Sequence, residues 1–130
     1  MKNLIRVVTV AVGLGALVLT GGCAVLLVGA AIGAGTVAYV QGELRSADEV
    51  TFDHAWKAAL AAMDELKFKV TKSQKDAIAG EIDATGSGDK NVVIKLRRQG
   101  DQVTEIRIRV GVFGDEGLSR LIQTKIKQHY

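Results

Sequence analysis

The feature that most constrains this chain is a run without a single charged residue, residues 7–42, between Arg6 and Glu43. From Glu43 to the C-terminus, charged residues recur every few positions. As one straight helix the run would measure about 54 Å at about 1.5 Å per residue, which exceeds the hydrocarbon core of a bilayer, roughly 30 Å. A break at Gly21-Gly22 would divide it into two apolar pieces, followed by a water-soluble body.

The first piece has the three parts of a secretory signal that ends at Cys23. Residues 1–6 are basic, residues 7–19 are apolar, and residues 20–22 are small. This order predicts a lipoprotein signal peptide over residues 1–22, cleaved before a lipidated Cys23. The usual leucine three places before the cysteine is replaced by Thr20, with Leu19 one place earlier. The alternatives are an uncleaved N-terminal anchor and two short membrane helices.

The second piece, residues 23–42, is predicted to be a lipidated cysteine followed by an apolar membrane-proximal segment. Gly29 and Gly33 stand four residues apart, a spacing at which helices pack closely in lipid. This spacing indicates self-association at the membrane, and a small-residue linker is an equal alternative. Ala24 stands after Cys23 where an aspartate would signal inner-membrane retention in enteric bacteria, which favours the outer membrane.

The body, residues 43–130, is predicted to begin and end its folded part with amphipathic helices. Thr51 is a good N-cap for a helix over 51–66, and Asp53 suits its first turn. The apolar face of that helix comprises Phe52, Trp56, Ala59, Leu60 and Met63, with Trp56 as a core residue. The last helix begins after Gly114 with Asp115 as its cap. Its apolar stripe comprises Leu118, Leu121, Ile122 and Ile126.

Between the helices, period-two alternation and short Gly/Asp turns predict four antiparallel strands. The buried faces are expected to include Ile78 at one strand start and Val112 at another strand end. Rough alternation over 36–50 indicates a further strand in front. The expected fold is therefore α+β, an antiparallel meander of four strands, or five, flanked by two amphipathic helices.

Composition and motifs exclude several functions. Without Lys2 and Arg6, the 17 Lys and Arg become 15 against 14 Asp and Glu, which is no signature of nucleic-acid binding. The one cysteine precludes an internal disulfide. Of the two histidines, His54 lies beside a helix start and His129 is expected to fray at the C-terminus. No catalytic, metal or cofactor motif is found, so a non-enzymatic protein is expected.

One charged cluster is expected on the sheet. Lys95 and Arg97 share the outward face of one strand, and Arg107 and Arg109 that of the next. Paired around Gly100, these strands would form a cationic patch facing lipid headgroups or a phosphate-bearing envelope polymer. The favoured interpretation is instead a solvated face on which Glu105 and Asp101 relieve the charge.

Residues 33–60 and 109–120 resemble a family of small bacterial envelope lipoproteins classed only as a domain of unknown function. The resemblance implies export and lipidation, and it brings no catalytic residues. The expectation is a membrane-anchored envelope lipoprotein facing the periplasm. It would bind membrane lipid through Cys23 acyl chains and an envelope protein or anionic polymer through its body. The alternative is a membrane-associated oligomerising protein with an uncleaved anchor.

Overall fold

The computed structural model describes residues 35–130. Cys23, Gly29 and Gly33, and with them the predicted signal peptide, lie outside the described residues. The elements follow in the order β1 (Val37–Val40), β2 (Glu43–Asp48), α2 (Phe52–Glu65), β3 (Lys69–Lys75), β4 (Ala79–Thr85), a short 3-10 turn η1 (Ser87–Asp89), β5 (Asn91–Gly100), β6 (Val103–Val110) and α3 (Glu116–Gln128).

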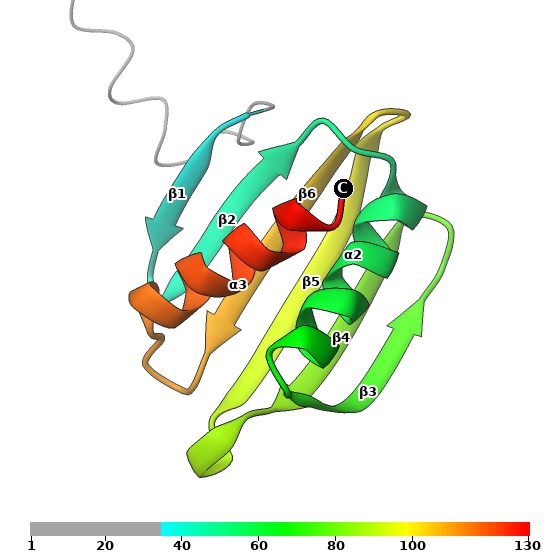
Figure 1. Ribbon diagram of the computed structural model, residues 1–130. Coiled ribbons are helices and arrows are strands. Elements are labelled where there is room, and N and C mark those ends of the chain that lie inside the picture. Colours follow the sequence, from blue (N-terminus) through cyan, green and yellow to red (C-terminus); the bar gives the residue numbers. More distant parts are fainter. Residues whose placement is uncertain (1–34) are drawn as a thin grey trace, which may run out of the picture. The chain divides into compact units, whose positions relative to one another are not determined.

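The strands form one six-stranded sheet in the order β1-β2-β6-β5-β4-β3, and every neighbouring pair is antiparallel (Figure 1). The α+β prediction is confirmed, whereas the predicted number of four or five strands is wrong. The stretch 36–50 holds two strands joined by a tight turn at Gln41-Gly42. Both turn residues have positive φ, 51° and 79°, as two-residue hairpin turns require. Glutamine is not a residue that this turn favours, so the turn could not be predicted from the sequence. β1 lies within residues 23–42, the segment that the sequence assigns to the membrane-proximal region.

Helix α2 forms as predicted. The Thr51 hydroxyl accepts a hydrogen bond from the His54 backbone N–H at 3.3 Å, and Asp53 lies in the first turn. The face that packs on the sheet is apolar, and Trp56 is 7% exposed within the core. The interpretation of Trp56 as a core residue is therefore confirmed.

Helix α3 begins where predicted, and the carboxylate of Asp115 accepts from the backbone N–H of Leu118 at 3.0 Å. Its apolar stripe was predicted wrongly at one position, because Leu121 is 45% exposed. Ser119 and Gln123 instead occupy buried positions beside Ile122. This happens because α3 lies over β2, where polar Ser46 and Asp48 face the helix.

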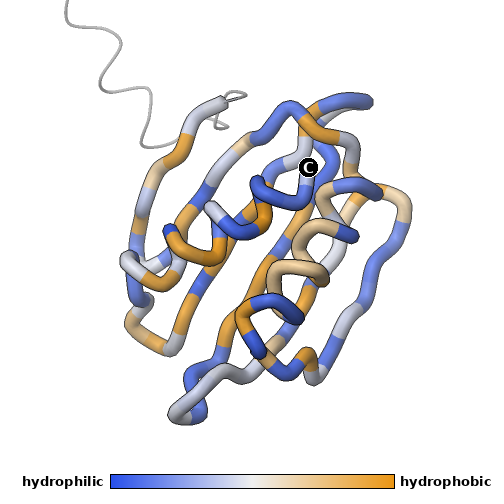
Figure 2. Tube along the Cα trace, in the orientation of Figure 1, coloured by the Kyte–Doolittle hydropathy of each residue, from blue (hydrophilic) through white to orange (hydrophobic). Residues whose placement is uncertain are grey.

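The core lies between the sheet and the two helices, which occupy the same face of the sheet (Figure 1). Hydrophobic residues run along β5 and β6 behind the helices (Figure 2). Residues of the central strands that point to the helices are fully buried: Ile82, Ile94, Leu96, Ile106 and Ile108. Two residues expected in the core are exposed, because Ile78 lies in the β3–β4 turn and Val112 in the loop after β6.

Neither α2 nor α3, the two α-helices of residues 35–130, has the combination of length and apolar character needed to cross a bilayer.

Candidate functional site

The face of the sheet that points away from the helices, here called the open face, carries most of the charged side chains of the strands. The strand pairing arranges them in rows. One row across the sheet reads Glu81, Lys95, Arg107, Arg45, and the next reads Ala79, Arg97, Glu105, Ala47. The alternation that buries Ile94 and Leu96 thus places Lys95 and Arg97 outward, as the period of two requires.

The strand pairing places Lys95, Arg97 and Arg107 in the two adjacent rows of this face. Lys95 pairs directly with Arg107 across β5 and β6, and Arg97 lies two residues further along β5. Arg109 lies two residues beyond Arg107 on the same face of β6, opposite Val93, but its guanidinium is bound elsewhere. Its guanidinium donates to the backbone carbonyls of Gln41 at 3.0 Å and Val112 at 3.4 Å. Arg109 therefore ties the β1–β2 turn to the loop after β6.

Carboxylates neutralise part of the open face. Arg107 donates from Nε to Glu105 Oε1 at 2.8 Å, and this hydrogen bond raises the pKa of the guanidinium. Glu81 accepts from Lys72 at 3.1 Å and lies 3.7 Å from Lys95 Nζ. The hydrogen bond from Lys72 is the main reason that the pKa of Glu81 is lowered. Glu105 thus pairs with a cation of this face, whereas Asp101 lies in the β5–β6 turn. Glu81 was missed because the sequence does not show which strand pairs with β4.

Arg97 differs from its neighbours. It is exposed, and among residues 35–130 its guanidinium has neither a hydrogen bond nor an ion pair. Its neighbours across the sheet are the small Ala79 on β4 and Glu105 on β6, and Glu105 already accepts from Arg107. Arg97 is therefore the described cation of this face whose charge is least compensated.

A groove of about 480 Å³ opens on this face beside Arg97. We call it the open-face groove. Its walls come from the end of β3, from β4, β5 and β6, and its lining residues are Gln74, Lys75, Asp76, Ala79, Gly80, Glu81, Lys95, Leu96, Arg97, Glu105 and Arg107. Such a volume falls within the range of small-molecule sites, about 300–1,000 Å³. The methyl side chain of Ala79 leaves room that a larger residue would fill.

The chemistry offered by the groove is hydrogen bonding and charge. Guanidinium and ammonium groups donate, and carboxylates accept. Among residues 35–130, no group of three histidine, cysteine, aspartate or glutamate side chains is placed to hold a metal ion. The arrangement suits a ligand that carries both negative charge and hydroxyl groups.

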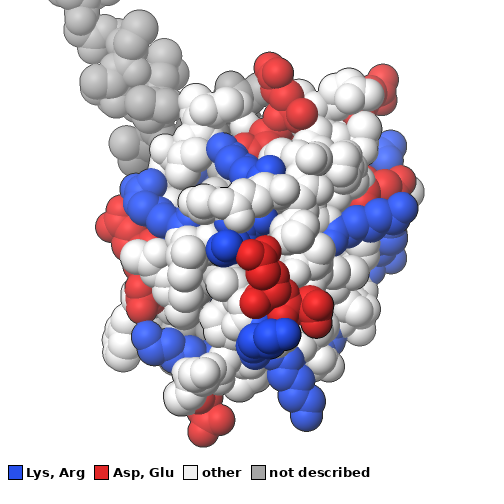
Figure 3. Space-filling model, viewed as in Figure 1, with Lys and Arg blue, Asp and Glu red and all other residues white. Residues whose placement is uncertain are grey.

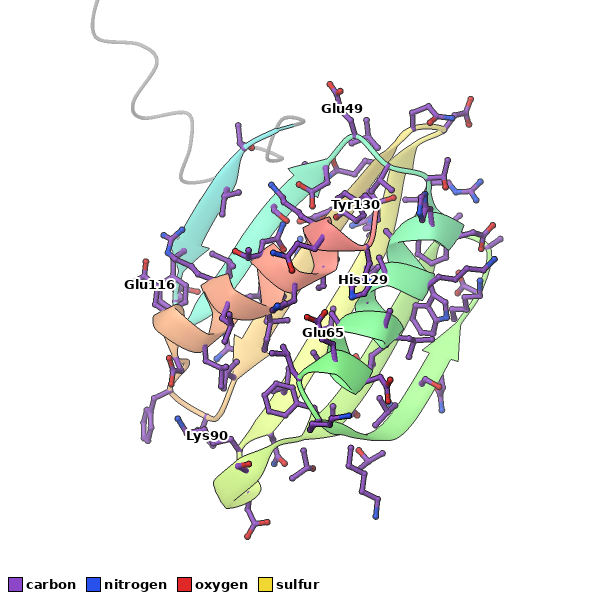
Figure 4. The ribbon with its side chains drawn as sticks, viewed as in Figure 1. Glu49, Glu65, Lys90, Glu116, His129 and Tyr130 are labelled. Carbon is purple, nitrogen blue, oxygen red and sulfur yellow. The ribbon has the colours of Figure 1, made fainter. Side chains whose placement is uncertain are left out.

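A second charged cluster links the ends of the two helices. Glu65 of α2 accepts from Lys125 at 2.7 Å and lies 2.9 Å from His129 Nε2 (Figure 4). The hydrogen bonds from Lys125 and His129, in that order, lower the pKa of Glu65. The expectation that His129 frays is wrong, since Glu65 holds its ring. Because Lys and His both hold this carboxylate, the cluster fastens α2 to α3.

The surface over the helices differs from the groove. Lys and Arg are interspersed there with Asp and Glu, without an extended area of one sign (Figure 3). The loop between β6 and α3 instead presents two apolar side chains, Val112 at 83% and Phe113 at 94% exposure. Sequence reasoning missed this loop because Val112 continues the strand alternation. Gly111 and Gly114, with φ of 69° and 84°, end the strand there.

Two comparisons with known proteins bear on this chain. No curated protein matches it. A family model described as Protein of unknown function (DUF3568) matches residues 4–129, nearly the whole chain. The resemblance to a family of unknown function, first seen in residues 33–60 and 109–120, is thereby confirmed, and the chain belongs to that family.

Proposed function

We propose that this chain is a lipoprotein of the bacterial cell envelope, anchored through Cys23, whose domain is a non-enzymatic binding module. The observation that carries the proposal is the one-sided construction of the domain. Both helices pack on one face of the sheet, and the other face holds a charged groove with an uncompensated arginine. A face that is not needed to bury the core is free to bind another molecule.

The anchor is supported by the order of residues in the N-terminal segment. A basic start, an apolar stretch and small residues before Cys23 match a lipoprotein signal. Two or three acyl chains on Cys23 give stable membrane attachment, whereas one chain gives only reversible binding. The described domain follows this segment closely, with β1 beginning at Val37. The proposed location is the periplasmic side of a membrane, with the outer membrane favoured.

The proposed non-enzymatic role is supported by the contacts that the candidate catalytic residues make. His54 contacts the ring of Tyr130 edge-on, with 6.3 Å between ring centroids, and His129 is held by Glu65. The groove contains arginine, lysine and carboxylates that are largely paired with one another. These pairings fit a surface that recognises a ligand.

The test is the intact mass of the full chain purified from membranes of a bacterial host. The expected mature protein begins at Cys23 and carries two or three acyl chains. The Cys23→Ser variant is the matched control and should keep residues 1–22. A wild-type mass that begins at Met1 with an unmodified thiol would overturn the proposed anchor.

The second candidate is a membrane-associated protein that oligomerises through an uncleaved anchor. The observation that favours it is the four-residue spacing of Gly29 and Gly33 in an uncharged segment. Replacing both glycines with leucine should then abolish crosslinked oligomers in membranes. Oligomers that persist in this double variant would refute the candidate.

A further inference from the structure

The cations of the open face outnumber the carboxylates that they bind. Glu81 serves both Lys72 and Lys95, and Glu105 serves Arg107. The other two charged residues that line the groove, Lys75 and Asp76, already bind other groups. Lys75 Nζ lies 2.7 Å from Asp53 on α2, and Asp76 accepts from the backbone N–H groups of Ile78 and Ala79. Arg97 has no partner within residues 35–130, so the face has positive charge to spare.

The spare charge is concentrated at one place. Lys95 and Arg107 are directly paired across β5 and β6, so their Cβ atoms lie about 5 Å apart. Arg97 follows Lys95 by two residues on the same face, about 7 Å along the strand. Three long side chains with cationic ends can therefore converge on one anionic group. A phosphate suits them best, because a guanidinium binds it through two parallel hydrogen bonds.

The groove offers more than a phosphate site. Its volume of about 480 Å³ leaves space beside the three cations. Glu81 and Glu105 line that space, and an ionised carboxylate can only accept hydrogen bonds. A second phosphate would be repelled there, whereas hydroxyl groups would be bound. Glu81 on β4 and Glu105 on β6 flank the cations of β5, so carboxylates border the cationic site on two sides. This combination matches a sugar that carries a phosphate.

We propose that the open-face groove binds a phosphorylated sugar unit, with the phosphate on Arg97, Lys95 and Arg107 and the sugar hydroxyls on Glu81 and Glu105. This inference rests on the proposed function, since an envelope module meets such units in phosphate-bearing envelope polymers. Arg97 contributes most to affinity, because binding does not require it to release an internal carboxylate. Lys95 and Arg107 bind the phosphate while they keep contact with Glu81 and Glu105.

The test is a titration of the isotopically labelled full chain in detergent micelles, followed by NMR. Glucose 6-phosphate should shift backbone signals of residues 79–81, 95–97 and 105–107, and glucose alone should bind at least tenfold more weakly. The Arg97→Gln variant should lose at least tenfold in affinity. Arg98→Gln is the matched control, because Arg98 lies next in sequence but contacts the Phe52 ring, with Cζ 5.9 Å from the ring centroid. Its affinity should equal that of the wild type.

Three results would overturn the inference. Equal affinity for glucose and glucose 6-phosphate would exclude a phosphate site, and equal affinity for inorganic phosphate would exclude the sugar. Shifts of the same residues by phosphatidylglycerol vesicles, with none by glucose 6-phosphate, would assign the groove to a lipid headgroup instead. The intact mass of the membrane protein separates these failures from failure of the proposed function. If Cys23 is acylated but no sugar phosphate binds, only the inference about the ligand is refuted, and the proposed anchor stands.

Discussion

One face of the sheet forms the hydrophobic core and the other carries the charged groove. Strand β5 shows this difference between successive residues. Ile94 and Leu96 point to the helices and are 0% and 1% exposed. Lys95 and Arg97, their neighbours in sequence, point away from the helices and line a groove. Burial of apolar area, about 25 cal/mol per Å², stabilises the fold mainly from the helix-covered face, where the hydrophobic core lies. The comparison teaches that the fold depends on one face and leaves the chemistry of the other adjustable.

The largest effect is expected from a cavity on the helix-covered face. Ile94→Ala removes buried methyl and methylene groups among side chains that cannot fully collapse, so the free energy of unfolding should fall by about 3 kcal/mol. Urea unfolding followed by circular dichroism measures it. Lys95→Ala, one residue away on the open face, is the matched control and should change stability by less than about 0.5 kcal/mol. Similar losses in both variants would contradict the division between the faces.

The helix-covered face also contains one buried polar cluster among its apolar side chains. Gln123 on α3 donates from Nε2 to Ser46 Oγ at 2.8 Å and to Asp48 Oδ2 at 3.0 Å, and all three residues are buried. Gln123→Ala should cost about 2 kcal/mol in the free energy of unfolding, because a buried carboxylate loses a donor. The exposed Gln128→Ala on the same helix should be neutral. A neutral Gln123→Ala would mean that other groups satisfy Asp48.

The same cluster should make stability depend on alkaline pH. Burial, and then the hydrogen bond from the Tyr130 hydroxyl to Asp48 at 2.6 Å, raises the pKa of Tyr130 well above its usual 10.0. A raised pKa means that the folded state keeps the proton longer, so stability is complete below pH 10 and falls as pH rises further. Tyr130→Phe should cost about 1 kcal/mol at neutral pH. It should also flatten the decline above pH 10 in urea midpoints. Parallel profiles for wild type and variant would contradict the assignment.

The sequence predicted the elements that have strong periodicity and clear end signals. The alternation of β5 and β6 and the caps Thr51 and Asp115 were read correctly, because each is a local property of a few neighbouring residues. The hairpin at Gln41 was not predicted, since its turn needs a positive φ that glutamine rarely adopts. The position of Leu121 was misjudged because burial on α3 depends on which strand lies beneath it.

The candidate site was predictable in part for the same reason. The alternation alone places Lys95, Arg97 and Arg107 on one face. Their partners come from strand order and register, which the sequence does not state. Glu81 reaches Lys95 only because β4 pairs with β5 in this register, and Arg109 is drawn away only because the β1–β2 turn lies beside it. The hollow beside Arg97 likewise depends on Ala79 being its neighbour across the strands.

The smallest effect on stability, and the sharpest separation of the two faces, is expected from Glu81→Gln. The change keeps the shape of the side chain and removes the charge that Lys72 and Lys95 share. Because the side chain of Glu81 is 34% exposed, its ion pairs are screened, and the free energy of unfolding should fall by less than about 0.5 kcal/mol. The lowered pKa of Glu81 determines how this stability difference changes with pH. The wild-type advantage is present above the ordinary glutamate pKa of 4.5 and disappears as pH falls through the lowered value.

The same variant should alter binding in a way that stability does not report. Without the carboxylate, Lys95 is released toward the phosphate, but one acceptor for sugar hydroxyls is weakened. Affinity for inorganic phosphate should therefore rise, while the preference for glucose 6-phosphate over inorganic phosphate should fall, both measured by NMR titration. Lys72→Gln is the control, since it leaves Glu81 in place and removes a cation that is not part of the groove lining. If Glu81→Gln instead destabilised the domain as strongly as Ile94→Ala, the open face would help to determine the fold, and its charges could not be assigned to binding alone.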